Sequence, residues 1–96
     1  MVLERALIPV LPGHEEQFEQ AIAQARGVVA RAQGFRGMRV LRGIESPQSY
    51  LLLIEWDSVE DHMQGFRESE LFGEWRALIG PHFDGTPQVE HYTPLD

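Results

Sequence analysis

The chain has 96 residues, of which 43% are hydrophobic and 24% charged, and this composition predicts one globular domain over residues 1–96. It contains no cysteine, which excludes disulfides, thiolate metal sites and a cysteine nucleophile. The net charge of −7 disfavours a nucleic-acid partner, because phosphate binding needs clustered basic residues.

Neither a membrane span nor a secretion signal is expected. The longest apolar run without proline covers residues 50–54 and is far too short to cross a bilayer. Glu4 and Arg5 interrupt the first apolar stretch, which is untypical of a signal peptide. We therefore expect a soluble, cytoplasmic protein.

The first half of the chain predicts a strand, a helix and a second strand. Residues 2–10 alternate in the manner of a strand, and residues 14–33 place apolar side chains at helical spacing. Gly34 is suited to end that helix, because glycine readily adopts the left-handed conformation found there. Residues 35–44 predict a strand that continues as far as Ile44.

The second half predicts two more strands with helical structure between them. Residues 49–57 form a strand that is apolar on both faces. Residues 58–79 form one broken helix or two short ones, with Ser58 as the N-cap and a slip in the periodicity near Ser69. After a loop, residues 88–93 form the last strand.

The element order β-α-β-β-α-β predicts an α+β fold of the ferredoxin-like type. Its two helices can cover only one face of a four-stranded sheet, so the other apolar face is expected to pack against a second subunit in a homodimer. The charge supports two interpretations, because residues 1–44 carry +2 and residues 45–96 carry −9. This asymmetry fits a solvated acidic surface, or a basic surface that meets an acidic one across the dimer. Which face of residues 49–57 lies at the interface stays open: the one with Leu51, Leu53 and Glu55, or the opposite one.

Several motifs resemble the antibiotic biosynthesis monooxygenase family, a group of dimeric α+β barrel proteins. The motifs are Pro12-Gly13, Glu55-Trp56, His62-x3-Phe66-Arg67-x-Ser69-x5-Trp75-Arg76 and Pro87-x-Val89-Glu90-His91-Tyr92. The resemblance spans almost the whole chain and implies a ferredoxin-like subunit with a cavity between its sheet and its helices. Better-understood relatives oxidise polycyclic phenols without flavin or metal, degrade haem, or isomerise small carbonyl compounds.

The haem-degrading branch of that family fits this chain poorly. It uses an asparagine on the first strand, a tryptophan in the second helical region and a haem-ligating histidine downstream. Alignment with the branch places Ala6, Phe66 and Arg76 at these positions. We therefore expect no haem binding.

Two histidines are candidate catalytic residues. His62 lies one helical turn before Phe66, and an imidazole titrates in the range that suits proton removal from a phenol. The alternative is a half-exposed helical histidine beside Asp61. His91 alternates with Tyr92, so only one of them faces the helices, and a packed or interfacial histidine is the alternative there.

The other two histidines, His14 and His82, are expected on the surface. No histidine pair has metal-ligand spacing, so no metal and no other cofactor is expected. Of the strand arginines, Arg5, Arg39 and Arg42, we expect pairing with Glu55 or Glu90 across the sheet. The alternative is that one of these arginines faces the cavity and stabilises an oxyanion.

Four aromatic residues are the candidate substrate-binding residues: Phe66, Trp56, Trp75 and Tyr50. They would surround a flat aromatic ligand, and ordinary core packing is the alternative. Together these observations predict a cofactor-independent monooxygenase that oxidises an aromatic phenol or quinol. The alternative is a non-catalytic dimeric module that binds or senses a small ligand. Acid–base groups converging on the cavity would favour the enzyme, and a wholly apolar lining would favour the binding module.

Overall fold

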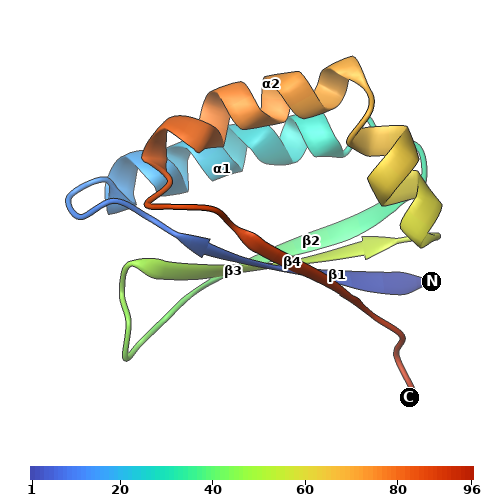
Figure 1. Ribbon diagram of the computed structural model, residues 1–96, viewed down its shortest axis with the longest axis horizontal. Coiled ribbons are helices and arrows are strands. Elements are labelled where there is room, and N and C mark those ends of the chain that lie inside the picture. Colours follow the sequence, from blue (N-terminus) through green and yellow to red (C-terminus); the bar gives the residue numbers. More distant parts are fainter.

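The computed structural model describes residues 1–96 and contains a four-stranded antiparallel sheet with both helices on one face (Figure 1). The strands lie in the order β2-β3-β1-β4. They are β1 (Val2–Pro9), β2 (Phe35–Arg42), β3 (Ser49–Trp56) and β4 (Gln88–Tyr92). Helix α1 (Glu15–Val29) connects β1 to β2, and the helical segments η1 (Asp61–Phe66) and α2 (Glu70–Ile79) connect β3 to β4. The predicted ferredoxin-like α+β fold is confirmed.

The two faces of β3 have different environments. Tyr50, Leu52, Ile54 and Trp56 lie beneath the helices and are at most 1% exposed. The alternate residues lie on the helix-free face, where Leu51 and Leu53 are half-buried and Glu55 is exposed. Helix α1 packs its apolar stripe, which includes Phe18 and Ile22, into the same core. Burial of each such side chain contributes about 1.5–3 kcal/mol, so this face holds the subunit together.

The largest differences from the predicted element boundaries concern the end of α1, the end of β2 and the loop after α2. Helix α1 ends at Val29 rather than at residue 33, because the next residues form tighter three-residue turns before Gly34, whose φ is +86°. Strand β2 ends at Arg42, since the Gly43 N–H closes the hairpin onto the Ser49 carbonyl at 2.8 Å. Ile44 is therefore 89% exposed instead of lying in a strand.

The remaining boundary concerns the expected loop after α2, whose first residues form a short 3-10 turn, η2 (Gly80–His82). Neither α1 nor α2 combines the length and the hydrophobicity that a membrane-spanning helix requires.

After β3 the chain forms two separate helical pieces, η1 and α2, and the break between them lies at Ser69 as the periodicity predicted. The Asp61 N–H donates to the Ser58 Oγ at 3.1 Å, which confirms the predicted cap. The first piece, η1, is a π-helix in which the Arg67 N–H donates to the carbonyl of His62, five residues earlier, at 2.9 Å. Such wide turns are rare and occur frequently at functional sites.

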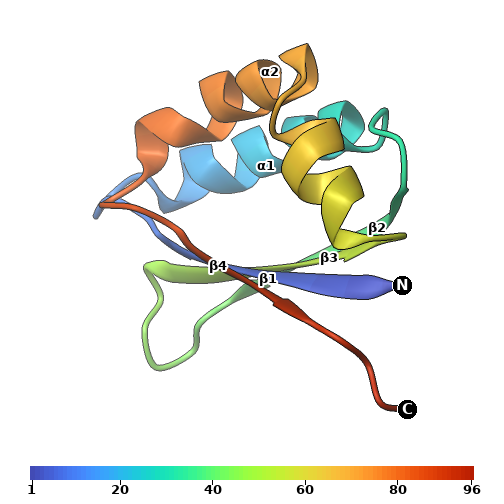
Figure 2. The ribbon, with the colours of Figure 1, turned by 45° about the vertical axis from the view of Figure 1, so that its right-hand side comes forward.

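Segment η1 stands above the end of the sheet where β1 begins and β3 ends (Figure 2). Its wide turn buries both His62 and Phe66, which are 4% and 2% exposed. Glycine at position 34 lets this segment lie close to the end of α1, because a Cβ there would collide with the Asp61 side chain. The fold therefore brings His62 over the inner face of β1.

Candidate active site

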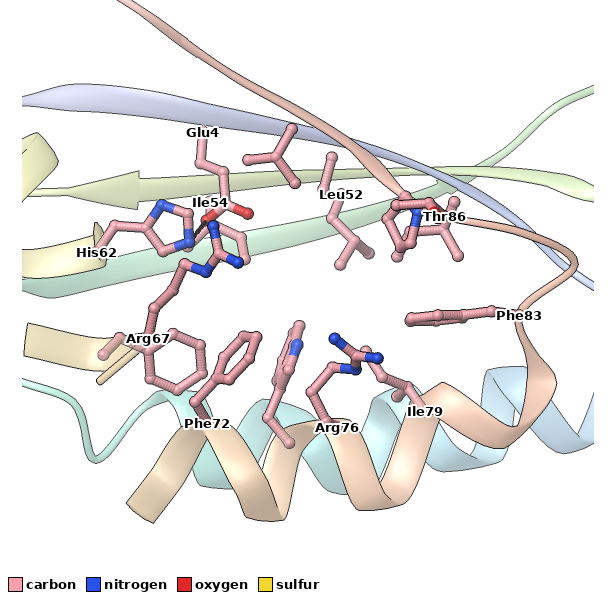
Figure 3. A pocket seen from close by; sticks show the side chains of 16 residues that line it. Glu4, Leu52, Ile54, His62, Arg67, Phe72, Arg76, Ile79, Phe83 and Thr86 are labelled. Carbon is pink, nitrogen blue, oxygen red and sulfur yellow. Dashed lines mark ion pairs between the residues drawn. The ribbon is translucent and has the colours of Figure 1, made fainter. Parts of the chain in front are cut away.

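A cavity of about 210 Å³ lies between the sheet and α2 (Figure 3). Ten of the sixteen residues that line it are hydrophobic, and they come from β1, β3, η1, α2, β4 and the segment before β4. Its polar lining consists of Glu4, His62, Arg67, Arg76 and Thr86. Acidic, basic and imidazole groups therefore converge on an otherwise apolar space, which is the condition that favours an enzyme over a simple binding pocket.

Glu4 is a buried carboxyl group on the inner face of β1 and is 5% exposed. Its Oε1 accepts a hydrogen bond from the Trp56 Nε1 at 2.9 Å and lies 3.3 Å from the His62 Nε2. Burial raises the pKa of Glu4 to about 7, against the opposing effects of the Trp56 hydrogen bond and the Arg67 charge. A carboxyl group with this pKa can accept or release a proton near neutral pH.

His62 is neutral in this environment. Burial and, secondarily, the charges of His91 and Arg67 lower the pKa of His62 to about 4. The imidazole stacks on the Trp56 ring at 5.2 Å between ring centroids, and its Nδ1 lies 2.8 Å from the His91 Nε2. A neutral imidazole has one N–H, so the proton position on His62 depends on both of its neighbours.

His91 is the member of the alternating pair on β4 that faces the helices. It lies opposite Glu4 in the β1–β4 register and is half-buried. Tyr92 points to the helix-free side, where its hydroxyl contacts Glu90 at 3.1 Å. The three groups Glu4, His62 and His91 thus come from three different elements and form one continuous set of contacts.

Two arginines of the helical region face the cavity without a carboxylate partner. Arg67 and Arg76 both lie over the Phe72 ring, with 5.5 and 5.9 Å from guanidinium carbon to ring centroid, and neither takes part in an ion pair of the structure. Figure 3 shows the Arg67 guanidinium beside Glu4 and His62, and Arg76 nearer to Phe83. These two positive charges are available to an anionic ligand.

The strand arginines are placed differently. Arg5 pairs with Glu90 at 3.3 Å on the helix-free side of the sheet, which confirms the expected cross-strand pair. Arg42 pairs instead with Glu19 of α1 at 3.2 Å, and Arg39 is exposed. The alternative of a strand arginine in the cavity is therefore wrong, because the inward positions of β1 and β2 near the cavity hold other residues.

Of the four candidate substrate-binding aromatic residues, two line the cavity. Phe66 and Trp75 meet edge to face at 5.9 Å, and both are part of the lining. Trp56 lies behind His62 and contacts Glu4 rather than the cavity. Tyr50 lies at the opposite end of β3, outside this lining, and its hydroxyl donates to Glu19 at 2.5 Å.

The two remaining histidines, which were predicted on the surface, contact each other. His14 and His82 are half-buried, with 3.2 Å between their Nδ1 atoms. The Leu11 N–H donates to the His82 carbonyl at 2.9 Å and holds the two chain segments together. No group of three or more histidine, aspartate or glutamate side chains is arranged to hold a metal ion.

Sequence reasoning missed Glu4, Arg67 and Arg76 as cavity residues. A signal for Glu4 was present, because it shares the inward parity of β1 with Ala6 and Ile8 and is the one charged residue of that set. The arginines gave no comparable signal, since the broken helix made the orientation of their side chains unpredictable. The three positions at which the haem-degrading branch has its functional residues, Ala6, Phe66 and Arg76, all line the cavity.

Comparisons with known proteins agree on one family. The family model described as antibiotic biosynthesis monooxygenase matches residues 1–78. YczJ of Bacillus subtilis (strain 168) is 37% identical over 92 residues, which cover 96% of this chain and 97% of that protein.

Solved structures give the same result. A family protein from Bordetella bronchiseptica has 45% identity and a TM-score of 0.96, with coverage of 98% of this chain and 96% of that one. SnoaB of Streptomyces nogalater, described as a cofactor-independent oxygenase, has 18% identity and a TM-score of 0.82, with coverage of 99% and 93%. The similarity to SnoaB concerns the fold alone.

Proposed function

The chain belongs to the antibiotic biosynthesis monooxygenase family, and from this membership and its cavity we propose that it is a cofactor-independent monooxygenase that oxidises an aromatic phenol or quinol. One observation carries the proposal: a buried carboxyl–imidazole pair and two unpaired guanidinium groups share an apolar cavity. The description of SnoaB as a cofactor-independent oxygenase is consistent with it.

The proposed chemistry starts with proton removal. The carboxylate of Glu4 takes the acidic proton of the substrate, and the resulting anion transfers one electron to O₂. The two radicals then combine to form a carbon–oxygen bond, and the peroxide, once protonated, loses water to leave a carbonyl group. For anthrone as a model substrate, anthrone and O₂ give anthraquinone and one water molecule, so atoms and electrons balance without a further reductant.

The other residues of the cavity stabilise the anions of this sequence. Arg67 and Arg76 are exposed residues whose side chains line the cavity, and they offer positive charge to the phenolate and to the peroxide. Phe66, Phe72 and Trp75 provide faces and edges for a planar ring and exclude water from the reactive anion. The ionised Glu4 is held by Trp56, which donates to its Oε1, and the His62 Nε2 lies 3.3 Å from the same oxygen.

The proposal includes a homodimer. The helix-free face of the sheet presents leucines that are only half-buried in the isolated subunit: Leu3, Leu7, Leu41, Leu51 and Leu53. Leu7, Leu51 and Leu41 are direct neighbours across the sheet, and an exposed apolar patch of this kind is typical of a subunit interface. We propose that the same face of a second copy covers it, with Leu51, Leu53 and Glu55 among the contact residues.

Oxygen consumption tests the function directly. The purified, chelator-treated protein is mixed with anthrones and hydroquinones, and O₂ uptake is followed in a single turnover. We expect the wild-type protein to oxidise at least one of these compounds, and Glu4→Gln and His62→Ala to lower the rate by about 10²-fold each.

The matched control is Glu74→Gln, which replaces a carboxyl group that pairs with Arg31 on the exposed side of α2. Its rate should equal that of the wild-type protein. If no compound of the panel is oxidised, the enzyme proposal fails and the ligand-binding module takes its place. If Glu4→Gln reacts as fast as the wild-type protein, Glu4 is not the base.

A further inference from the structure

We propose that Glu4, His62 and His91 form a proton relay that connects the cavity to solvent at β4, the edge strand of the sheet. Its use in catalysis rests on the proposed function, because the substrate is the source of the proton. The relay itself is a property of the three side chains and can be tested without a substrate.

The contacts form an unbroken chain. The Glu4 Oε1 lies 3.3 Å from the His62 Nε2, and the His62 Nδ1 lies 2.8 Å from the His91 Nε2. The second contact is within ordinary hydrogen-bond distance, whereas the first must shorten slightly, as catalytic contacts commonly do when a substrate binds. Each imidazole therefore has one nitrogen toward the cavity end of the chain and the other toward its outer end.

Both ends of this chain are open. The Glu4 Oε2 and the His91 Nδ1 form no hydrogen bond within the protein. Every side-chain oxygen or nitrogen that is shielded from solvent does have a hydrogen-bond partner, so these two atoms are not among the shielded ones. Both atoms are thus accessible to solvent. Glu4 belongs to the cavity lining and the half-buried His91 does not. One end therefore opens into the cavity and the other outside it.

Each proton in the relay has a defined donor and acceptor. When Glu4 is protonated, both rings carry their proton on Nδ1. Glu4 then gives its proton to the His62 Nε2, His62 gives its Nδ1 proton to the His91 Nε2, and His91 gives its Nδ1 proton to water. Glu4 is left ionised and both rings carry their proton on Nε2. The reverse sequence brings one proton from water to Glu4, and it can replace the proton that a peroxide intermediate takes up.

The electrostatic environment of the relay favours transfer of a proton over its retention on His62. The groups that act on Glu4 are Trp56, His62 and Arg67, and those that act on His62 are Glu4, His91 and Arg67. Burial, followed by the effects of His91 and Arg67, holds the pKa of His62 at about 4, so the ring does not keep a second proton near neutral pH. A proton that enters the relay is therefore passed on, and the observable result is a change of tautomer in the two rings.

Nuclear magnetic resonance of the protein labelled with ¹⁵N-histidine measures that change of tautomer. Between about pH 5 and 9 we expect His62 to change from the Nε2–H tautomer at high pH to the Nδ1–H tautomer at low pH, without becoming an imidazolium. His91 should change tautomer with the same midpoint. In Glu4→Gln, which cannot titrate, His62 should keep one tautomer throughout, whereas the control Glu74→Gln should behave as the wild-type protein does. A single His62 tautomer in the wild-type protein, or protonation of His62 independent of Glu4, would overturn the relay.

His91→Gln separates the relay from a structural role, because glutamine keeps a hydrogen bond to His62 but cannot pass a proton on. With a compound that the wild-type protein oxidises, we expect the first turnover to be retained and continuous turnover to fall about tenfold, with a smaller solvent isotope effect. Equal continuous rates would contradict the relay. If the tautomers change but the protein oxidises none of the compounds, the relay is supported and the proposed reaction is wrong. Failure of the relay and failure of the proposed function are therefore distinguishable.

Discussion

Replacement of Glu4 by glutamine is expected to stabilise the protein at about pH 8 and to have little effect on stability near pH 4.5. Folding raises the pKa of this carboxyl group from 4.5 to about 7, mainly because burial disfavours the charged form. Between these two values the folded state binds a proton that the unfolded state has lost, so the free energy of unfolding falls as the pH rises. Each pKa unit corresponds to about 1.4 kcal/mol, so the rise from 4.5 to about 7 gives a cost of roughly 3–4 kcal/mol above pH 7.

Glutamine removes that cost, because it is neutral at every pH and its amide oxygen can still accept from Trp56. His62 has the opposite effect: folding lowers its pKa from 6.5 to about 4, so the unfolded state binds more protons in that range and stability rises with pH. In the wild-type protein the effects of Glu4 and His62 on the free energy of unfolding oppose each other between pH 4.5 and 6.5. In Glu4→Gln only the rising slope of His62 remains.

Urea unfolding at several pH values, followed by the fluorescence of the buried Trp56 and Trp75, measures this difference. Protein concentration must be held constant, since dimerisation would add to the apparent stability. Glu74→Gln serves as the control for loss of a surface carboxyl group. A stability difference that does not change with pH, or a Glu4→Gln protein that is less stable than the wild type at pH 8, would refute the reasoning.

Three further outcomes are expected. Sedimentation at micromolar concentration should show a dimer, and Leu53→Glu on the helix-free face should give a folded monomer; a stable wild-type monomer would contradict this. Titration with haemin should give no stoichiometric Soret shift and no loss of the band after addition of reductant and oxygen, because Ala6, Phe66 and Arg76 replace the residues that the haem-degrading branch uses. Arg76→Met should lower phenol oxidation by about 10- to 100-fold through loss of anion stabilisation, whereas Arg31→Met at the surface should not.

The fold was accessible from the sequence because its signals are local and repeated. The alternation in β3 and the apolar stripe of α1 each involve many residues, so one misread residue such as Ile44 moves a boundary without changing the topology. The family resemblance added the cavity between sheet and helices. The choice between the two faces of β3 needed the structure, because both faces are apolar.

The candidate site was only partly accessible, because its chemistry depends on contacts between distant segments. His62 and Phe66 were placed together from their spacing, and both line the cavity. The contact of His62 with His91 joins residues on η1 and β4, and no local pattern predicts it. Glu4 could have been noticed from its inward parity, but its raised pKa depends on burial by segments that lie far away in the sequence.

Isotope labelling tests the proposed function most directly. Anthrone is incubated under ¹⁸O₂ with the chelator-treated protein, and the anthraquinone formed is analysed by mass spectrometry against samples with Glu4→Gln and without protein. The proposed chemistry predicts one ¹⁸O atom in each anthraquinone molecule and a rate at least about 10²-fold above that of the Glu4→Gln variant. Product that carries only ¹⁶O, or labelled product that forms as fast without the protein, would contradict it.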